Sequence, residues 1–251
     1  MTKLAFISDL HSNFDALTAV LKHLDEVGCD QILCLDDVVG YGPEPAQCVQ
    51  EIQKREIPTV LGNHDEYVSA IMDPHVKELR QEVQDAISWT QAQLNWDELT
   101  WLGKLPFSME ADDEFTILHS SFAPGRWAYC LDERTFQNNF KCQQPQLAFC
   151  GHSHSPLYAW EETPGDTPFV DYIPGASRKR KVPTEGKVMV NVGSVGQPRD
   201  RDPRACVVFY ELESRELWLD RVPYDTEATR QKILATKKLP PRFGDRLLLG
   251  K

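Results

Sequence analysis

Histidine and acidic side chains follow several short apolar segments of this 251-residue chain. One such segment, Leu147–Cys150, is apolar throughout, lies between a proline and a glycine, and predicts a short buried strand. His152 and His154 come just after it, in a loop where two imidazoles one residue apart can turn toward neighbouring metal ions. Taken alone, this loop fits two histidines bonded to solvent equally well. Similar residues at other predicted strand ends favour metal binding.

These strand ends together offer carboxylate, imidazole and amide groups, a ligand set that suits divalent Mn, Fe, Zn or Ni. A single tetrahedral site needs fewer ligands, so the simplest arrangement is two divalent metal ions that share one carboxylate. Two neighbouring ions of this kind can activate water and hold a phosphoryl group for in-line displacement. The candidate metal ligands are Asp9, His11, Asp37, Asn63, His119, His152 and His154.

The first half of the chain alternates predicted strands and helices. Strands are expected over residues 4–8, 32–35 and 57–61, and the strand–helix–strand opening implies a parallel pair. Asn13 is a helix cap, and apolar residues then recur at helical spacing until Gly28. A short helix carries Val49 and Ile52. Asp73 is expected to cap a longer helix that ends near residue 94, before a shorter one that ends near residue 103.

The second half is richer in predicted strands. Residues 105–110 and 114–118 resemble a hairpin turned at Asp112 and Asp113, and a helix is expected over residues 132–140. Further strands are expected over residues 158–160, 169–173, 187–191, 205–210 and 216–222, before a helix that follows Asp225. This order predicts an α/β fold, a four-layer αββα sandwich of two mixed β-sheets flanked by helices. We expect one domain over residues 1–251, with a docked or loose tail from about residue 238.

Composition limits the classes of partner. The chain has 27 basic and 38 acidic residues and a formal charge of −11, which disfavours tight nonspecific nucleic-acid binding. A small phosphate ester can still bind, because bound divalent ions dominate the local field. The basic run at residues 178–181 predicts a solvated loop, with a phosphate-facing rim as the alternative.

The sequence also indicates where the protein works. It has no apolar run long enough to span a membrane, and its first residues lead straight into a predicted strand without signal-peptide features. Its seven cysteines are scattered and form no paired motif, as expected in a reducing compartment. We therefore expect a cytoplasmic protein without membrane association.

Five ordered blocks resemble the calcineurin-like metallophosphoesterase superfamily. A later segment, residues 191–200, is similar to the small prokaryotic phosphodiesterases within it. The similarity spans residues 4 to about 210. The blocks are Asp9 with His11, residues 37–43, residues 62–65, His119, and residues 151–154.

The resemblance implies how the ligands divide between two ions. One ion would be held by Asp9, His11, Asp37 and His154. The other would be held by Asp37, Asn63, His119 and His152. Asp37 would therefore bridge the two.

The resemblance also implies a mechanism in which a metal-bridging hydroxide attacks phosphorus in line. His64 matches the family histidine that donates a hydrogen bond or a proton to the phosphoryl or leaving group, and Asp65 could orient it. The substrate would be a small phosphate ester, with a nucleotide as one candidate, and phosphodiesterase is favoured over protein phosphatase or dinucleoside polyphosphate hydrolase.

One position departs from the family pattern. Asp36 stands where the family usually has a glycine before the bridging carboxylate. It could weaken activity or reach an ion, but we expect it to point into solvent, because adjacent strand residues face opposite ways.

Candidate substrate contacts are fewer. Arg199 could bind a phosphate or a nucleotide, or pair with Asp200 as a structural ion pair. Tyr41 could stack on a substrate ring or simply pack in its glycine–proline loop. Trp127 is a further candidate for the cleft wall.

Two rival interpretations remain. A non-catalytic scaffold of this fold, which binds protein partners, would be expected to lack His64 or several ligands, and this sequence has them all. An HD-type phosphohydrolase is suggested by His64 and Asp65, but that pair would be expected on a helix, whereas here it follows a predicted strand.

Overall fold

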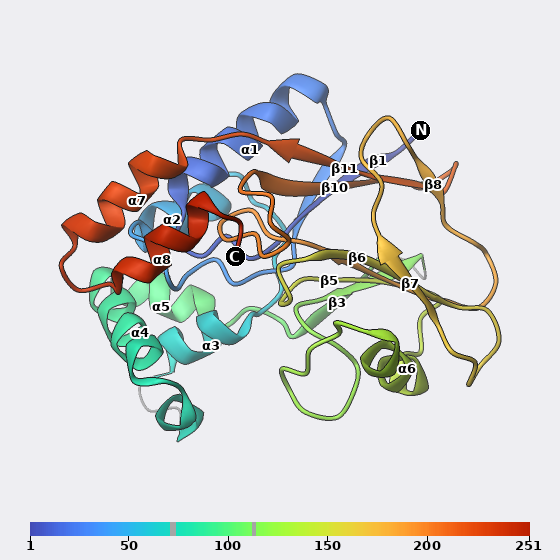
Figure 1. The fold of residues 1–251 in the computed structure, drawn as a ribbon, viewed down its shortest axis with the longest axis horizontal. Helices are drawn as coiled ribbons and strands as arrows, with labels where there is room; N and C mark the ends of the chain where they lie inside the picture. The colour runs from blue at the N-terminus through green and yellow to red at the C-terminus, as the bar shows by residue number, and fades with distance from the viewer. Residues whose placement is uncertain (71–73, 112–113) are drawn as a thin grey trace.

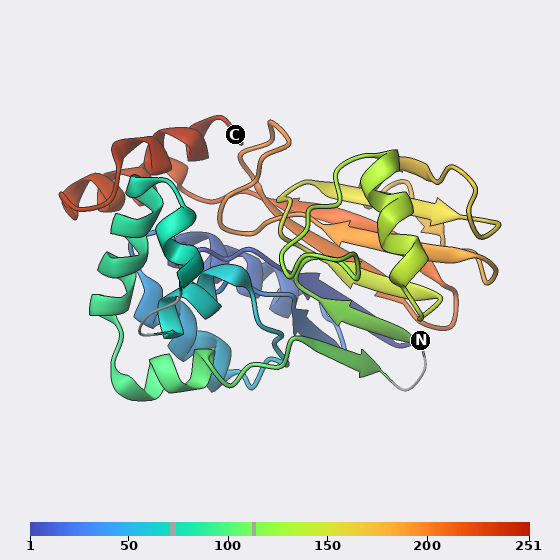
Figure 2. The same cartoon turned by 90° about the horizontal axis from the view of Figure 1, so that it is seen from below.

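Two mixed β-sheets face each other in the computed structural model, which describes residues 1–70, 74–111 and 114–251. Helix α1 (Phe14–Val27) covers the outer face of one sheet, and helix α6 (Glu133–Cys142) covers the outer face of the other (Figure 1). Most of the remaining helices gather at one end of the sheets (Figure 2). The predicted α/β class and the αββα arrangement are confirmed.

The first sheet is antiparallel except for one pair. Strand β1 pairs in parallel with β2 and antiparallel with β10. Its order is β2 (Gln31–Cys34), β1 (Lys3–Ile7), β10 (Ala205–Glu211), β11 (Glu216–Val222) and β8 (Arg180–Lys181).

The second sheet has a parallel centre. Strand β5 lies between β4 and β9 and is parallel to both, so the carboxyl ends of all three point the same way. Its order is β3 (Ser108–Ala111), β4 (Phe115–Leu118), β5 (Leu147–Cys150), β9 (Lys187–Val192), β6 (Pro156–Glu161) and β7 (Phe169–Tyr172).

Apolar side chains fill all three interfaces between the layers. Between the sheets, the rings of Phe6 and Phe149 stack with centroids 4.0 Å apart. Leu17 of α1 and Phe136 of α6 are fully buried against the outer faces. A central strand such as β5 is therefore apolar throughout, because both of its faces are covered.

Several local predictions differ from the structure. Residues 57–61 form no strand but only an isolated bridge between Thr59 and Cys34. Pro58 has no amide hydrogen, so it cannot donate the next hydrogen bond of a ladder. Helix α3 (Asn63–Ser69) was not predicted. The predicted long helix is divided into η1 (Pro74–Glu78) and α4 (Gln81–Gln93). The predicted cap Asp73 and the predicted turn at Asp112 and Asp113 lie outside the described residues.

The other helices complete the cluster at one end of the sheets. They are α2 (Pro45–Lys54), α5 (Trp96–Leu102), α7 (Thr226–Ala235), α8 (Pro241–Asp245) and η2 (Arg246–Leu248). The final segment is packed, because Leu239, Phe243 and Leu247 are buried with Ala86 of α4 and Ile233 of α7. Within the described parts of the chain, no helix is long and apolar enough to span a membrane.

Candidate metal centre

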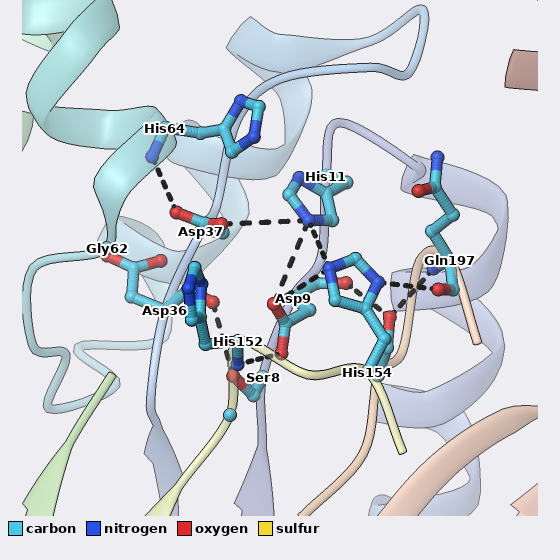
Figure 3. Close-up of polar contacts among 12 residues, drawn as sticks. Ser8, Asp9, His11, Asp36, Asp37, Gly62, His64, His152, His154 and Gln197 are labelled. Atoms are coloured by element: carbon cyan, nitrogen blue, oxygen red, sulfur yellow. Dashed lines mark hydrogen bonds and ion pairs between the residues drawn. The ribbon is translucent and has the colours of Figure 1, made fainter. Parts of the chain in front are cut away.

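The seven predicted metal ligands meet at the end of the sheets where α3 begins. Figure 3 shows five of them, Asp9, His11, Asp37, His152 and His154. They come from the loops that follow β1, β2, β4 and β5 and from the start of α3, and none is more than 7% exposed. Clustering at the carboxyl ends of strands is the usual place for a ligand site in an open α/β sheet. All seven are therefore brought together, from segments far apart in the sequence.

One group of ligand atoms surrounds Asp9. The Nε2 atoms of His11 and His154 lie 3.1 Å apart, and His154 Nε2 lies 3.2 Å from Asp9 Oδ1. His11 Nε2 lies 3.8 Å from the same oxygen and 3.7 Å from Asp37 Oδ2. Four donor atoms thus face one small volume.

A second group surrounds His119. Its Nε2 lies 3.3 Å from Asp37 Oδ2, 3.2 Å from Asn63 Oδ1 and 3.2 Å from His152 Nδ1. Asp37 Oδ2 faces His11 on one side and His119 on the other. The two groups therefore adjoin at one carboxylate oxygen.

Backbone carbonyls fix the histidine rings so that lone pairs face inward. The Nδ1 atoms of His11, His119 and His154 lie 3.2, 2.8 and 2.6 Å from the carbonyl oxygens of Val39, Leu35 and Gln197. A neutral ring that donates from Nδ1 keeps an unprotonated Nε2. His152 is reversed, because its Nε2 lies 3.1 Å from the Trp127 carbonyl and its Nδ1 faces the cluster. Such outer partners are typical of metal-binding histidines.

This donor set fits divalent cations. Asp9 Oδ1 is buried and accepts no hydrogen bond, although it faces the His11 and His154 nitrogens. Burial lowers the pKa of His11 and His154 well below the ordinary value and lowers the pKa of His152 to about 3. Neutral imidazoles facing a buried carboxylate are unsatisfied without a positive charge between them.

The backbone holds most of the candidate ligands in sparsely populated conformations. Five of them have positive φ angles between 46° and 67°. Such strain in non-glycine residues persists only where the surroundings enforce it, and it concentrates at functional sites. The five residues are Asp9, His11, Asp37, His152 and His154.

Asp65 and Gly62 hold the loop that carries Asp37. The Asp65 carboxylate accepts hydrogen bonds from the backbone amides of Asp37 (3.0 Å), Val39 (3.1 Å) and Gly62 (3.3 Å). Its oxygens therefore bind backbone amides and not the His64 ring, which corrects the expectation that Asp65 orients that ring. A Cβ atom on Gly62 would lie 2.2 Å from Asp37 Oδ1, so only glycine fits there.

His64 lies beside the cluster in the first turn of α3. Its backbone amide donates to Asp37 Oδ1 at 2.8 Å, and its ring centroid is 5.0 Å from that of His11. Its Nδ1 is buried without a hydrogen-bond partner. One ring nitrogen also lies within 4.8 Å of ligand atoms of His11 and Asp37.

Asp36 is buried, not exposed to solvent as predicted. It is 0% exposed, and neither carboxylate oxygen accepts a hydrogen bond. The prediction failed because β2 ends at Cys34, and both Asp36 and Asp37 then adopt positive φ angles of 75° and 64°. Alternation of side chains across a strand does not extend into such a turn. Burial and the neighbouring Asp65 raise the pKa of Asp36 well above its ordinary value.

The predicted substrate contacts line the same end of the molecule. Arg199 donates to Gln197 Oε1 at 3.0 Å, whereas Asp200 pairs with Arg221, so the proposed Arg199–Asp200 ion pair is absent. The Tyr41 ring packs with centroids 4.7 Å from His11 and 4.4 Å from His64.

Two aromatic side chains line the second group. Trp127, a candidate for the cleft wall from the sequence, packs edge-on to His119 with ring centroids 5.8 Å apart. Tyr129, which the motifs did not indicate, stacks on His152 with centroids 3.9 Å apart. It lies in an irregular loop that no periodic pattern could locate.

Two of the four basic residues at 178–181 are paired with acidic side chains, which disfavours the phosphate-facing rim. Lys179 pairs with Glu211 and Glu216, and Arg180 pairs with Asp171. These carboxylates already pair with Lys179 and Arg180, so the two side chains are not free to bind an anionic ligand.

The fold and the cluster define a protein with a candidate divalent-metal centre built on two facing sheets. Comparison with known proteins identifies the family. A family model described as a calcineurin-like phosphoesterase superfamily domain matches residues 2–215. The chain is also 32% identical over 252 residues to an uncharacterized protein from Methanocaldococcus jannaschii, a match that covers 99% of this chain and 98% of that protein. The chain therefore belongs to the calcineurin-like phosphoesterase superfamily.

Solved structures agree with this assignment. A metallophosphoesterase from Sphaerobacter thermophilus is 33% identical, with a TM-score of 0.86, and the match covers 100% of this chain and 99% of that one. A hypothetical protein from Pyrococcus horikoshii OT3 shares the fold at 17% identity, with a TM-score of 0.79 and coverage of 100% and 99%. His64 and Asp65 lie on helix α3, so the expectation that they are not helical, which was the argument against an HD-type phosphohydrolase, is wrong. The family match excludes the HD-type interpretation instead.

Proposed function

We propose that the protein is a phosphodiesterase that depends on two divalent metal ions. The observation that carries this proposal is the position of Asp37 Oδ2, 3.7 Å from His11 Nε2 and 3.3 Å from His119 Nε2. A carboxylate placed between two groups of histidine nitrogens is what two ions sharing one ligand require.

In this proposal, each group holds one ion. The first ion is bound by Asp9, His11, Asp37 and His154, and the second by Asp37, Asn63, His119 and His152. Manganese, iron, zinc and nickel all suit such mixed nitrogen and oxygen ligands. When bound, the two ions supply an activated water and neutralise the charge that develops on the phosphoryl oxygens.

The protein's own groups orient the substrate and move the proton. The His64 ring lies beside Asp37 and His11, and its buried Nδ1 has no partner within the described structure. In the proposed role, His64 donates a proton to the leaving oxygen after in-line displacement begins. Asp65 acts through the backbone by fixing the Asp37 loop.

The substrate we propose is a small phosphate diester, for which a nucleotide is one candidate. The net charge of −11 opposes tight binding of long nucleic acids. All seven cysteines are free, which agrees with the proposed location in the cytoplasm.

The test is hydrolysis of bis-p-nitrophenyl phosphate and p-nitrophenyl phosphate by protein stripped of metal and then loaded with Mn²⁺. The proposal expects metal-dependent turnover, with the diester preferred over the monoester. Preference for the monoester would replace the diesterase by a phosphatase. Turnover of neither compound by fully loaded protein would favour the non-catalytic scaffold.

A further inference from the structure

His152 differs from the other three candidate histidine ligands in what holds its ring. The other three rings point Nδ1 at backbone carbonyls of buried residues close to the strand ends. The His152 ring instead points Nε2 at the carbonyl of Trp127, 3.1 Å away, in the loop between β4 and α6. Trp127 is partly buried, and Arg126 beside it is exposed. The orientation of one ligand ring therefore depends on a surface loop.

One carboxylate on α3 holds this loop against the rest of the protein. Glu66 Oε2 accepts hydrogen bonds from the Trp127 indole nitrogen at 2.9 Å and from Arg126 Nε at 3.0 Å. Glu66 Oε1 pairs with Arg126 Nη2 at 2.7 Å. The Arg126 guanidinium also lies over the rings of Trp127 and Phe107, 5.3 and 5.2 Å from their centroids. Two adjacent loop residues thus give three contacts to one carboxylate, a forked arrangement that is stronger than an isolated surface ion pair.

The loop has further attachments, which hold its backbone. Ser120 Oγ donates to the Arg126 carbonyl at 3.0 Å, and the Phe122 amide donates to Asn139 Oδ1 of α6 at 2.8 Å. Glu66, by contrast, binds the Trp127 side chain itself. It is therefore the acid that holds the residue whose carbonyl orients His152.

Helix α3 serves the second group of ligands in two ways. It begins with Asn63, whose Oδ1 faces His119, and Glu66 follows one turn later. Through Glu66 and Trp127 the same helix also reaches His152. The histidines of the first group are held by carbonyls outside this loop. A change at Glu66 should therefore affect one group of ligands and spare the other.

We propose that Glu66 is a positioning residue for the second metal ion, the one assigned to the group around His119, and acts by orienting His152 through Trp127. This inference rests on the proposed function, because it assumes that each group holds one ion. Outer partners of ligating histidines fix the ring and its tautomer, and loss of one typically lowers metal affinity by about 10–100-fold. Glu66 lies one residue further from the ion than such a partner, so we expect the lower end of that range.

Two substitutions interrupt this route at different points, and a third is a matched control. Glu66→Ala removes the carboxylate, whereas Trp127→Phe removes the indole N–H and keeps an aromatic ring beside His119. The control is Glu51→Ala, because Glu51 also pairs with an arginine, Arg55, at 2.9 Å. The Glu51 side chain is 19% exposed, against 23% for Glu66. Its partner lies at the end of its own helix α2, away from the loop.

The experiment titrates metal-free protein with Mn²⁺ and follows binding by electron paramagnetic resonance, which distinguishes an isolated Mn²⁺ ion from a magnetically coupled pair. The wild type and Glu51→Ala should bind two ions and show the coupled signal. At the Mn²⁺ concentration that just fills both sites of the wild type, Glu66→Ala and Trp127→Phe should still show the isolated-ion signal. Their second dissociation constant should rise about tenfold, while the first stays within about twofold.

Glu66→Gln provides a milder test that also serves if the alanine variant does not fold. It keeps an oxygen that can accept from the Trp127 indole but loses the charge that faces Arg126. Its second dissociation constant should therefore lie between those of the wild type and Trp127→Phe.

The outcomes separate the two proposals. If the loaded wild type binds fewer than two ions, the two-ion part of the proposed function is wrong, and the role of Glu66 falls with it. If the wild type binds two ions and both variants keep its affinities, only the role of Glu66 is overturned. Equal weakening of both ions would overturn it too, because a general loosening of α3 reaches the shared ligand Asp37 through the His64 amide. Weakening in Glu66→Ala but not in Trp127→Phe would refute the route through Trp127.

Discussion

Substitution of Gly62 by alanine tests how the Asp37 loop is built. Gly62 has φ −97° and ψ 169°, an extended conformation open to any residue. If only backbone freedom mattered, alanine would stabilise the protein by about 0.4–1 kcal/mol, because it lowers the conformational entropy of the unfolded chain. The sign of the measured change therefore reports the contacts of the new methyl group.

Those contacts are too close to tolerate. The added Cβ would lie 2.2 Å from Asp37 Oδ1 and 2.4 Å from the Asp37 backbone nitrogen. Van der Waals contacts of a carbon atom begin about 1 Å beyond these distances. Because one of the two atoms belongs to the backbone, a rotation of the Asp37 side chain alone cannot relieve the clash. Overpacking of this kind costs about 1–3 kcal/mol. Because Asp37 is the proposed ligand of both ions, Gly62→Ala should also weaken the binding of both.

Gly103→Ala is the matched control. Gly103 has φ −68°, and its added Cβ would meet neighbours no closer than 3.5 Å. Urea unfolding of the metal-free variants should show Gly62→Ala less stable than the wild type and Gly103→Ala unchanged or more stable. Calorimetric titration with Mn²⁺ should show weaker binding only in Gly62→Ala. If Gly62→Ala matches the control in stability and binds Mn²⁺ like the wild type, the described packing of Gly62 against Asp37 is incorrect.

Three further substitutions test other parts of the site. His64→Ala should retain metal by elemental analysis but lower kcat by about 10²–10⁴-fold, the contribution of a general acid; unchanged turnover would remove His64 from the reaction. Asp65→Ala should lower Mn²⁺ affinity by about 10–100-fold, as loss of an outer partner does, whereas a loss confined to kcat would indicate action through His64. Phe243→Ala should destabilise the protein by about 3–5 kcal/mol in urea unfolding, because Phe243 is buried against Tyr41, and a change below about 1 kcal/mol would contradict that packing.

Local patterns were sufficient to mark most of the residues that cluster in the candidate metal centre. Asp9 and His11 follow a strand whose apolar run marks it clearly, and the same is true of His119 and His152. Parallel neighbours end at the same edge of a sheet, so a correct assignment of strands already brings such residues together. The sequence could therefore mark residues that cluster, but β1 and β5 belong to different sheets, and the division of the candidate ligands between two ions came from the family resemblance.

The errors lie where the chain leaves regular structure. Asp36 was expected in solvent because strand alternation was continued beyond Cys34, into a turn with two left-handed residues. Helix α3 was missed because its seven residues carry no clear apolar repeat and begin with ligands. Tyr129 reaches the site only through tertiary packing of a loop, and no local spacing reports such a contact.

The most direct test of the central claim is a crystal structure of the Mn²⁺-loaded protein with anomalous scattering data. The account predicts two manganese peaks per chain, both in contact with the Asp37 carboxylate, one beside His11 and His154 and the other beside His119 and His152. A single peak, or peaks that do not share Asp37, would contradict it.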